Sequence, residues 1–189
     1  TNGTTYNGTS YLEKFGATDE YSIGNNLFVG NCEMRNSGSG FFGMGNGNPD
    51  VWNSDLLINN IGSSAIRIGY NAVGNSISGD LIINELGIGT TNTWVDVAIL
   101  GASTFDIGGD VITTLNSTTT ATSYVYIGNN GSVDIAGNVN VDNIGTGTTS
   151  NFSIAQANPS IVNIDGDLFI NSNNTATNST INISGGTTT

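Results

Sequence analysis

Apolar residues recur at every second position in short runs along this chain, and the runs return at intervals of 24 to 30 residues. The runs open on related phrases: GNCEMR (30–35), SDLLIN (54–59), GDLIIN (79–84), GDVITT (109–114), GNVNVD (137–142) and GDLFIN (166–171). Side chains alternate between the two faces of a strand, so a spacing of two predicts β-strands with one apolar face. The spacings of three and four that a helix needs do not recur.

Alignment of the six copies on their first residue, the anchor, gives three inward columns. Two residues before the anchor stand Phe28, Trp52, Ile77, Ile107, Ile135 and Ile164; two after it stand Cys32, Leu56, Leu81, Val111, Val139 and Leu168; four after it stand Met34, Ile58, Ile83, Thr113, Val141 and Ile170. A second strand follows in each copy, with inward pairs Phe42/Met44, Ile66/Ile68, Val97/Ile99, Val125/Ile127, Phe152/Ile154 and Ile181/Ile183.

A strand pattern repeated at this period predicts an all-β fold, a parallel β-helix (β-solenoid) of about six coils of 24–30 residues, with a right-handed coil. One coil cannot bury its own apolar face, so neighbouring coils must stack in register. The first 22 residues fit the columns poorly, even with Gly8 in the anchor column, and residues 1–29 are expected to form an irregular first coil or cap. Residues 30–189 form the repeats, a single domain that reads as a fragment of a longer protein, and the closing SGGTTT predicts no capping helix.

Charge and composition narrow the classes of function. The formal net charge is −12, with 15 acidic residues against Lys14, Arg35 and Arg67. This balance opposes nucleic-acid binding, and no apolar run is long enough to span a bilayer. The chain has no histidine and one cysteine, which excludes serine–histidine triads, cysteine–histidine pairs and the usual zinc sites. Cys32 stands in an inward column, where we expect an inert buried thiol, and no catalytic residue is assigned.

An acidic column follows the anchor and points outward. Its members are Asn31, Asp55, Asp80, Asp110, Asn138 and Asp167. Stacking places them ~4.8 Å apart, where they can form a solvated acidic stripe, bind Ca²⁺, or supply a carboxylate pair for sugar cleavage. Further along the same strands, Asn59, Asn84 and Asn171 share a column with Asp142, where side-chain amides can form ladders between coils.

Two further surfaces are candidates for contact with other molecules. Leu57, Ile82, Ile112 and Phe169 make an outward apolar stripe that suits association with another copy or a neighbouring domain. The corner between the two strands is variable in length and rich in Ser, Thr and Asn: NSGSG, NIGSS, ELGIGTTNTW, LNSTTTATSY, NIGTGTTSN and NSNNTATNST. Trp94 and Tyr124 in this corner can act as an aromatic platform for glycans, although the composition by itself favours a plain, soluble loop edge.

Residues 36–84, with the phrases NSGSG and GNGNPD, resemble the repeats of very large surface proteins of gliding and other Bacteroidota. The resemblance implies an exported, adhesin-like protein of the type IX secretion class, displayed outside the cell, and it identifies no catalytic residues. We therefore expect a structural or adhesive segment of an extracellular surface protein or filament, a stiff spacer that contacts its own copies, other surface proteins or glycans. The alternatives are a carbohydrate-active enzyme using two acids among Asp80, Asp106, Asp110 and Asp134, and a glycan-binding module using Trp94.

Overall fold

The chain forms three parallel β-sheets wound as a solenoid, as predicted. The structure is a computed structural model that describes residues 2–157, 159–183 and 187–188; residues 184–186 and 189, where the sequence predicts no capping helix, lie outside this range. The described part contains strands and no helix, so no helix there is long and apolar enough to cross a membrane.

Each coil contains three strands and contributes one of them to each of the three sheets. The first sheet holds, in spatial order, β1 (Thr5–Tyr6), β4 (Leu27–Phe28), β7 (Val51–Trp52), β10 (Asn75–Ile77), β13 (Thr104–Ile107), β16 (Ser132–Ile135), β19 (Ile161–Ile164) and β22 (Thr187–Thr188). The second holds β2 (Ser10–Lys14), β5 (Cys32–Asn36), β8 (Leu56–Asn60), β11 (Leu81–Glu85), β14 (Val111–Leu115), β17 (Val139–Asn143) and β20 (Leu168–Ser172). The third holds β3 (Glu20–Tyr21), β6 (Phe42–Gly43), β9 (Ala65–Ile68), β12 (Thr93–Val97), β15 (Thr122–Ile127), β18 (Thr149–Ile154) and β21 (Asn178–Asn182).

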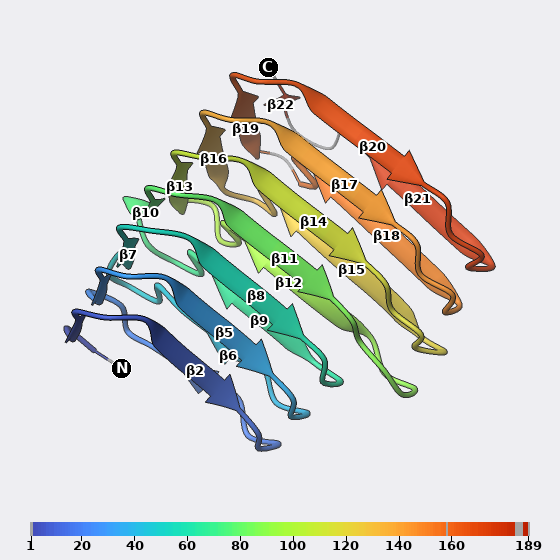
Figure 1. Cartoon of the computed structure of the whole chain (residues 1–189), viewed down its shortest axis with the longest axis horizontal. Helices are drawn as coiled ribbons and strands as arrows, with labels where there is room; N and C mark the ends of the chain where they lie inside the picture. The colour runs from blue at the N-terminus through green and yellow to red at the C-terminus, as the bar shows by residue number, and fades with distance from the viewer. Residues whose placement is uncertain (1, 158, 184–186, 189) are drawn as a thin grey trace.

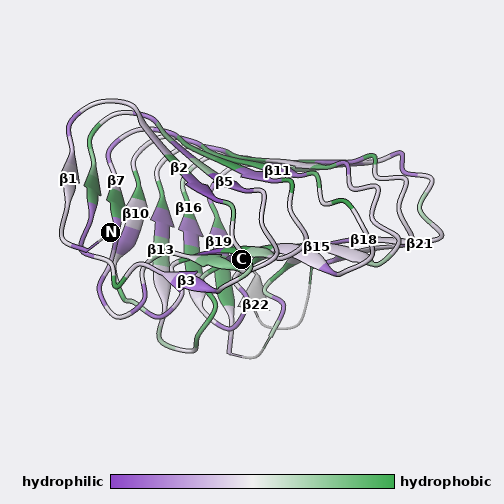
Figure 2. Ribbon diagram, turned by 90° about the horizontal axis from the view of Figure 1, so that it is seen from below, coloured by the Kyte–Doolittle hydropathy of each residue, from purple (hydrophilic) through white to green (hydrophobic). Residues whose placement is uncertain are grey.

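The coil is right-handed. In Figure 1 the second sheet lies in front, and the chain crosses it from upper left to lower right before it returns behind through the third sheet, one level closer to the C-terminus. Figure 2 shows the same three walls from below, with the second sheet above, the third below and the first at the left. Strands that are adjacent in a sheet are therefore one full coil apart in sequence.

Stacking in register is confirmed for the anchor columns. Leu81 pairs with Val111 and Val111 with Val139, and all three side chains are fully buried. The first coil follows the same register, since Tyr6 pairs with Phe28 and Ser10 with Cys32.

The sequence missed a bend in each coil. The column before the anchor lies on the first sheet and the two columns after it lie on the second, with the chain turning at the anchor. Inward and outward side chains continue to alternate through the bend. The sequence pattern therefore predicted one strand where the structure has two, one in the first sheet and one in the second.

One predicted register was wrong. Val95 and Val97, and not Val97 and Ile99, align with Ile66/Ile68 and with Val125/Ile127. A residue with positive φ directly follows each of β9, β12, β15 and β18: Gly69 (58°), Ala98 (54°), Gly128 (73°) and Ala155 (52°). Alanine stands where glycine is the usual left-handed residue, so nothing in the residue pattern indicated that the strand ends at Val97.

Aromatic and polar ladders complete the interior. At the N-terminal end, Tyr6, Phe28 and Trp52 stack with ring centroids 4.8 and 5.4 Å apart. At the start of the first-sheet strands, the buried Asp50 side chain accepts hydrogen bonds from the backbone and side-chain nitrogens of Asn26, at 2.9 and 2.7 Å. These bonds supply partners for the Oδ1 atom of Asp50, as burial of a polar atom requires.

Candidate functional site

The acidic column is a hydrogen-bonded ladder between coils. The Oδ1 atom of Asp55 accepts the backbone N–H of Asp80 at 3.0 Å, Asp80 accepts that of Asp110 at 2.8 Å, and Asp110 accepts that of Asn138 at 2.7 Å. The Oδ1 atom of Asn138 continues the ladder to the N–H of Asp167 at 2.9 Å. One oxygen of each of these side chains is therefore already bound to backbone.

The same ladder explains the glycines that precede Asp80, Asp110 and Asn138. A Cβ on Gly79 or Gly109 would lie 2.2 Å from the Oδ1 atom of the aspartate one coil earlier, and on Gly137 2.3 Å. Real Cβ atoms do not approach so closely, so only glycine leaves space for the carboxylate. The Gly–Asp dipeptide, the most recognisable feature of the sequence, thus acts as a stacking device at the corner between the first and second sheets.

In the described part of the chain, no three Asp, Glu, Cys or His side chains gather closely enough to hold a metal ion. The amide column behaves as predicted: the Asn84 side-chain nitrogen donates to Asn59 Oδ1 at 2.9 Å, and that of Asn171 donates to Asp142 Oδ1 at 3.0 Å.

The apolar stripe lies on the outer face of the second sheet. Leu57, Ile82 and Ile112 are register partners on β8, β11 and β14, and Phe169 lies on β20 beyond Asn140. Leu57 and Ile82 are half-buried by their neighbours, whereas Ile112 is 36 % and Phe169 55 % exposed. The second sheet thus presents a row of apolar side chains to solvent.

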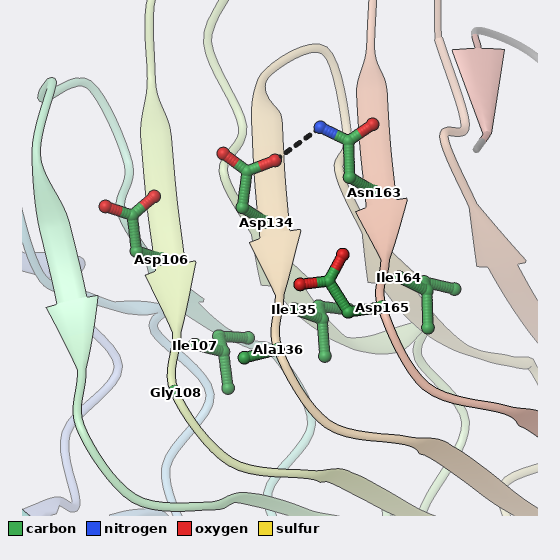
Figure 3. A pocket seen from close by; sticks show the side chains of 9 residues that line it. All are labelled: Asp106, Ile107, Gly108, Asp134, Ile135, Ala136, Asn163, Ile164 and Asp165. Carbon is green, nitrogen blue, oxygen red and sulfur yellow. Dashed lines mark hydrogen bonds between the residues drawn. The ribbon is translucent and has the colours of Figure 1, made fainter.

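Two of the acids considered for catalysis meet on the outer face of the first sheet. Asp106 and Asp134 are register partners on β13 and β16, and the Asn163 amide on β19 donates to Asp134. They line a hollow of about 490 Å³, in which Asp106, Asp134 and Asn163 stand in a row (Figure 3). Asp80 and Asp110 lie apart from this hollow, in the ladder at the corner.

Trp94 and Tyr124 lie on strands, and not in the corner loop where the sequence placed them. They are register partners on β12 and β15 of the third sheet, and both face outward. Tyr126 stands two residues further along β15, with its ring centroid 5.2 Å from that of Tyr124 and the ring planes 31° apart. Three aromatic side chains from two coils therefore share one face.

An ion pair between the buried Asp96 and the half-buried Arg67 lies at this aromatic face, and sequence reasoning did not find it. Asp96 is only 2 % exposed, and its carboxylate lies 3.4 Å from Arg67 Nε and accepts the Asn129 side-chain amide at 3.0 Å. Burial raises the pKa of Asp96 to about 6, an effect that the Asn129 hydrogen bond and Arg67 partly offset. The Arg67 guanidinium stacks over Phe41, with its carbon 4.5 Å from the ring centroid. These residues come from separate coils, so no local sequence motif indicates that they lie together.

A second buried acid, Glu85, lies inside the corner between the second and third sheets. Its Oε1 atom accepts the Gly87 N–H at 3.0 Å and the Thr93 hydroxyl at 2.7 Å, and its Oε2 atom accepts the Asn60 amide at 2.8 Å. Complete burial raises the pKa of Glu85 to about 7 despite these donors. The ion pairs of the described residues involve Glu13, Glu20 and Asp96, so Glu85 is held by neutral groups.

Comparisons with protein-family models, with curated proteins and with solved structures found no match to this chain.

Proposed function

We propose that this chain is a stiff structural segment of an extracellular surface protein or filament. The observation that carries the proposal is the unbroken register of all three sheets, in which each coil is bonded to the next through backbone and side-chain ladders. Stacked coils of this kind add length by repetition, ~4.8 Å a coil, and resist bending because every strand between the two ends of the stack is paired on both sides. Function then depends on the surfaces that the solenoid displays.

The apolar stripe supports lateral association in such an assembly. Isoleucines in register give a neighbouring copy a flat, repeating apolar contact, and outward apolar rows of this kind mark interaction surfaces. Replacement of Ile82 and Ile112 by glutamate should disperse any association seen by analytical ultracentrifugation. Thr114→Glu, an outward substitution on β14, is the matched control and should change nothing.

Display outside the cell is tested with antibodies against the chain. Immunogold electron microscopy of the producing cells should label the surface of intact, unpermeabilised cells, along filaments or patches. Labelling that appears only after permeabilisation would overturn the proposal.

Stiffness is tested by force spectroscopy, where the chain should resist extension until it unfolds cooperatively. Gradual extension at low force would contradict a spacer role.

A carbohydrate-cleaving enzyme is the second candidate, and the pairing of Asp106 with Asp134 is what favours it. Adjacent parallel strands are ~4.8 Å apart, close to the ~5 Å that separates the two carboxyl groups of retaining glycosidases. The assay is the release of reducing ends from a panel of polysaccharides, with Asp134→Asn as the test variant. Release that disappears in this variant would replace the structural proposal with an enzymatic one.

A further inference from the structure

The outer face of the third sheet combines aromatic rings with amides in a hollow of about 350 Å³. Its lining includes Arg67, Trp94, Asp96, Tyr124, Tyr126 and Asn129. This volume is at the lower end of the range for small-molecule sites, and a mixture of aromatic walls with a few convergent polar groups is typical of them. We name this surface the aromatic groove.

The groove continues along the solenoid axis. A second hollow of about 160 Å³ shares Tyr124 and Tyr126 and is otherwise lined by hydroxyl and amide side chains: Asn151, Ser153, Gln156, Thr180 and Asn182. These residues lie on or beside β15, β18 and β21, which are neighbours in the third sheet. The two hollows therefore form one track that crosses successive coils, with the tyrosine pair at its centre.

We propose that this track binds a neutral glycan chain. Pyranose rings present flat C–H faces that pack on aromatic rings, and their hydroxyl groups exchange hydrogen bonds with amides and hydroxyls, the two kinds of group found here. A sugar unit in an extended chain is about as long as the ~4.8 Å rise of one coil, so successive sugars meet successive strands. The groove thus matches a linear polysaccharide better than a compact ligand.

Charge selects for a neutral glycan. The only formal charges that line either hollow are Arg67 and Asp96, and these two side chains are paired with each other at 3.4 Å. The groove is consequently neutral as a whole, while the chain carries −12 and repels anionic polymers. Asp96, being 2 % exposed, holds Arg67 through the ion pair and Asn129 through a hydrogen bond.

The site is independent of the structural role, because binding does not require the chain to act as a spacer. The test is affinity electrophoresis and isothermal titration of the whole chain with named polysaccharides: a β-glucan, a xylan and a galactomannan as neutral probes, and alginate as the anionic one. We expect binding to at least one neutral probe, weakened about tenfold or more in Trp94→Ala and in Tyr124→Ala.

Phe169→Ala is the matched control, since it removes an exposed ring from the second sheet, and binding should persist at wild-type strength. Trp94→Phe and Tyr124→Phe keep a ring and guard against loss of folding, which circular dichroism monitors; they should bind more strongly than the alanine variants. The proposal is overturned by absence of binding to all neutral probes, by preference for alginate, or by equal binding in folded Trp94→Ala and Tyr124→Ala variants.

Discussion

Neutralising Glu85 should remove a large part of the pH dependence of this protein's stability. Glu85 is wholly buried at the corner between the second and third sheets, and its pKa of about 7 lies above the ordinary value of 4.5. A folded state that holds its proton more tightly than the unfolded state is most stable at low pH. The contribution is fully present below pH 4.5 and is lost as the pH rises to 7.

The magnitude follows from the shift. Raising the pKa from 4.5 to about 7 corresponds to ~3 kcal/mol of unfolding free energy at about 1.4 kcal/mol per unit. In Glu85→Gln the side chain carries no charge at any pH, so this part of the slope disappears. Asp96, whose pKa is raised to about 6, still contributes in the same direction. The variant should therefore retain a weaker loss of stability with rising pH.

The assay is urea denaturation at pH 4.5, 6 and 8, followed by the fluorescence of the buried Trp52. Between pH 4.5 and 8 the wild type should lose ~3 kcal/mol more than Glu85→Gln does. Asp106→Asn, which removes one charge from an exposed position on the first sheet, should keep the wild-type slope. An identical slope in wild type and Glu85→Gln would refute the reasoning.

Three further predictions concern residues in the anchor column or within two positions of it. Gly109→Ala should destabilise the chain by ~2–3 kcal/mol in urea denaturation, because the new Cβ would lie 2.2 Å from Asp80 Oδ1, whereas Gly8→Ala, with nothing within 4 Å, should be nearly neutral; equal losses would contradict the steric account. Asp110→Ala should lower stability by ~1–3 kcal/mol, since it leaves a backbone N–H of the next coil without its acceptor, and Asp110→Asn should restore most of it; an asparagine as harmful as alanine would contradict the ladder. The thiol of Cys32, 2 % exposed and with its pKa raised by burial to about 12, should react with a thiol reagent at pH 8 only after denaturation, as followed by absorbance, and rapid reaction of the folded chain would contradict its burial.

The strand faces and the coil period were open to prediction because both are periodic in the sequence. Apolar residues at every second position indicate which side chains face inward. A repeated motif such as GDLIIN indicates which residues of successive coils stack on one another. Leu81, Val111 and Val139 could therefore be aligned without coordinates. The recurrence of glycine at the anchor position could be recognised in the sequence. The reason for it could not, because the carboxylate that fills the space beside each glycine belongs to the preceding coil.

The candidate sites were less predictable, because each depends on where the chain turns. The corners differ in length, and Ala98 adopts a left-handed conformation that is usual for glycine, so the inward pair of β12 was predicted two residues too far along the chain. The predicted strand therefore began after Trp94, and Trp94 was assigned to the corner loop. The apolar stripe on the second sheet, by contrast, lies within one regular strand of each coil and was placed correctly.

The sequence by itself determined that this chain is a stack of coils with a narrow apolar interior, since period-two alternation and a repeated phrase are local signals. Only the tertiary structure decided which polar residues of separate coils meet. Asp96 joins Arg67 to Asn129, and Glu85 joins Asn60 to Thr93, across 25 residues or more in three of these four pairings and across 8 in the fourth. Such contacts depend on corner lengths and backbone bends, which no pattern along the chain encodes.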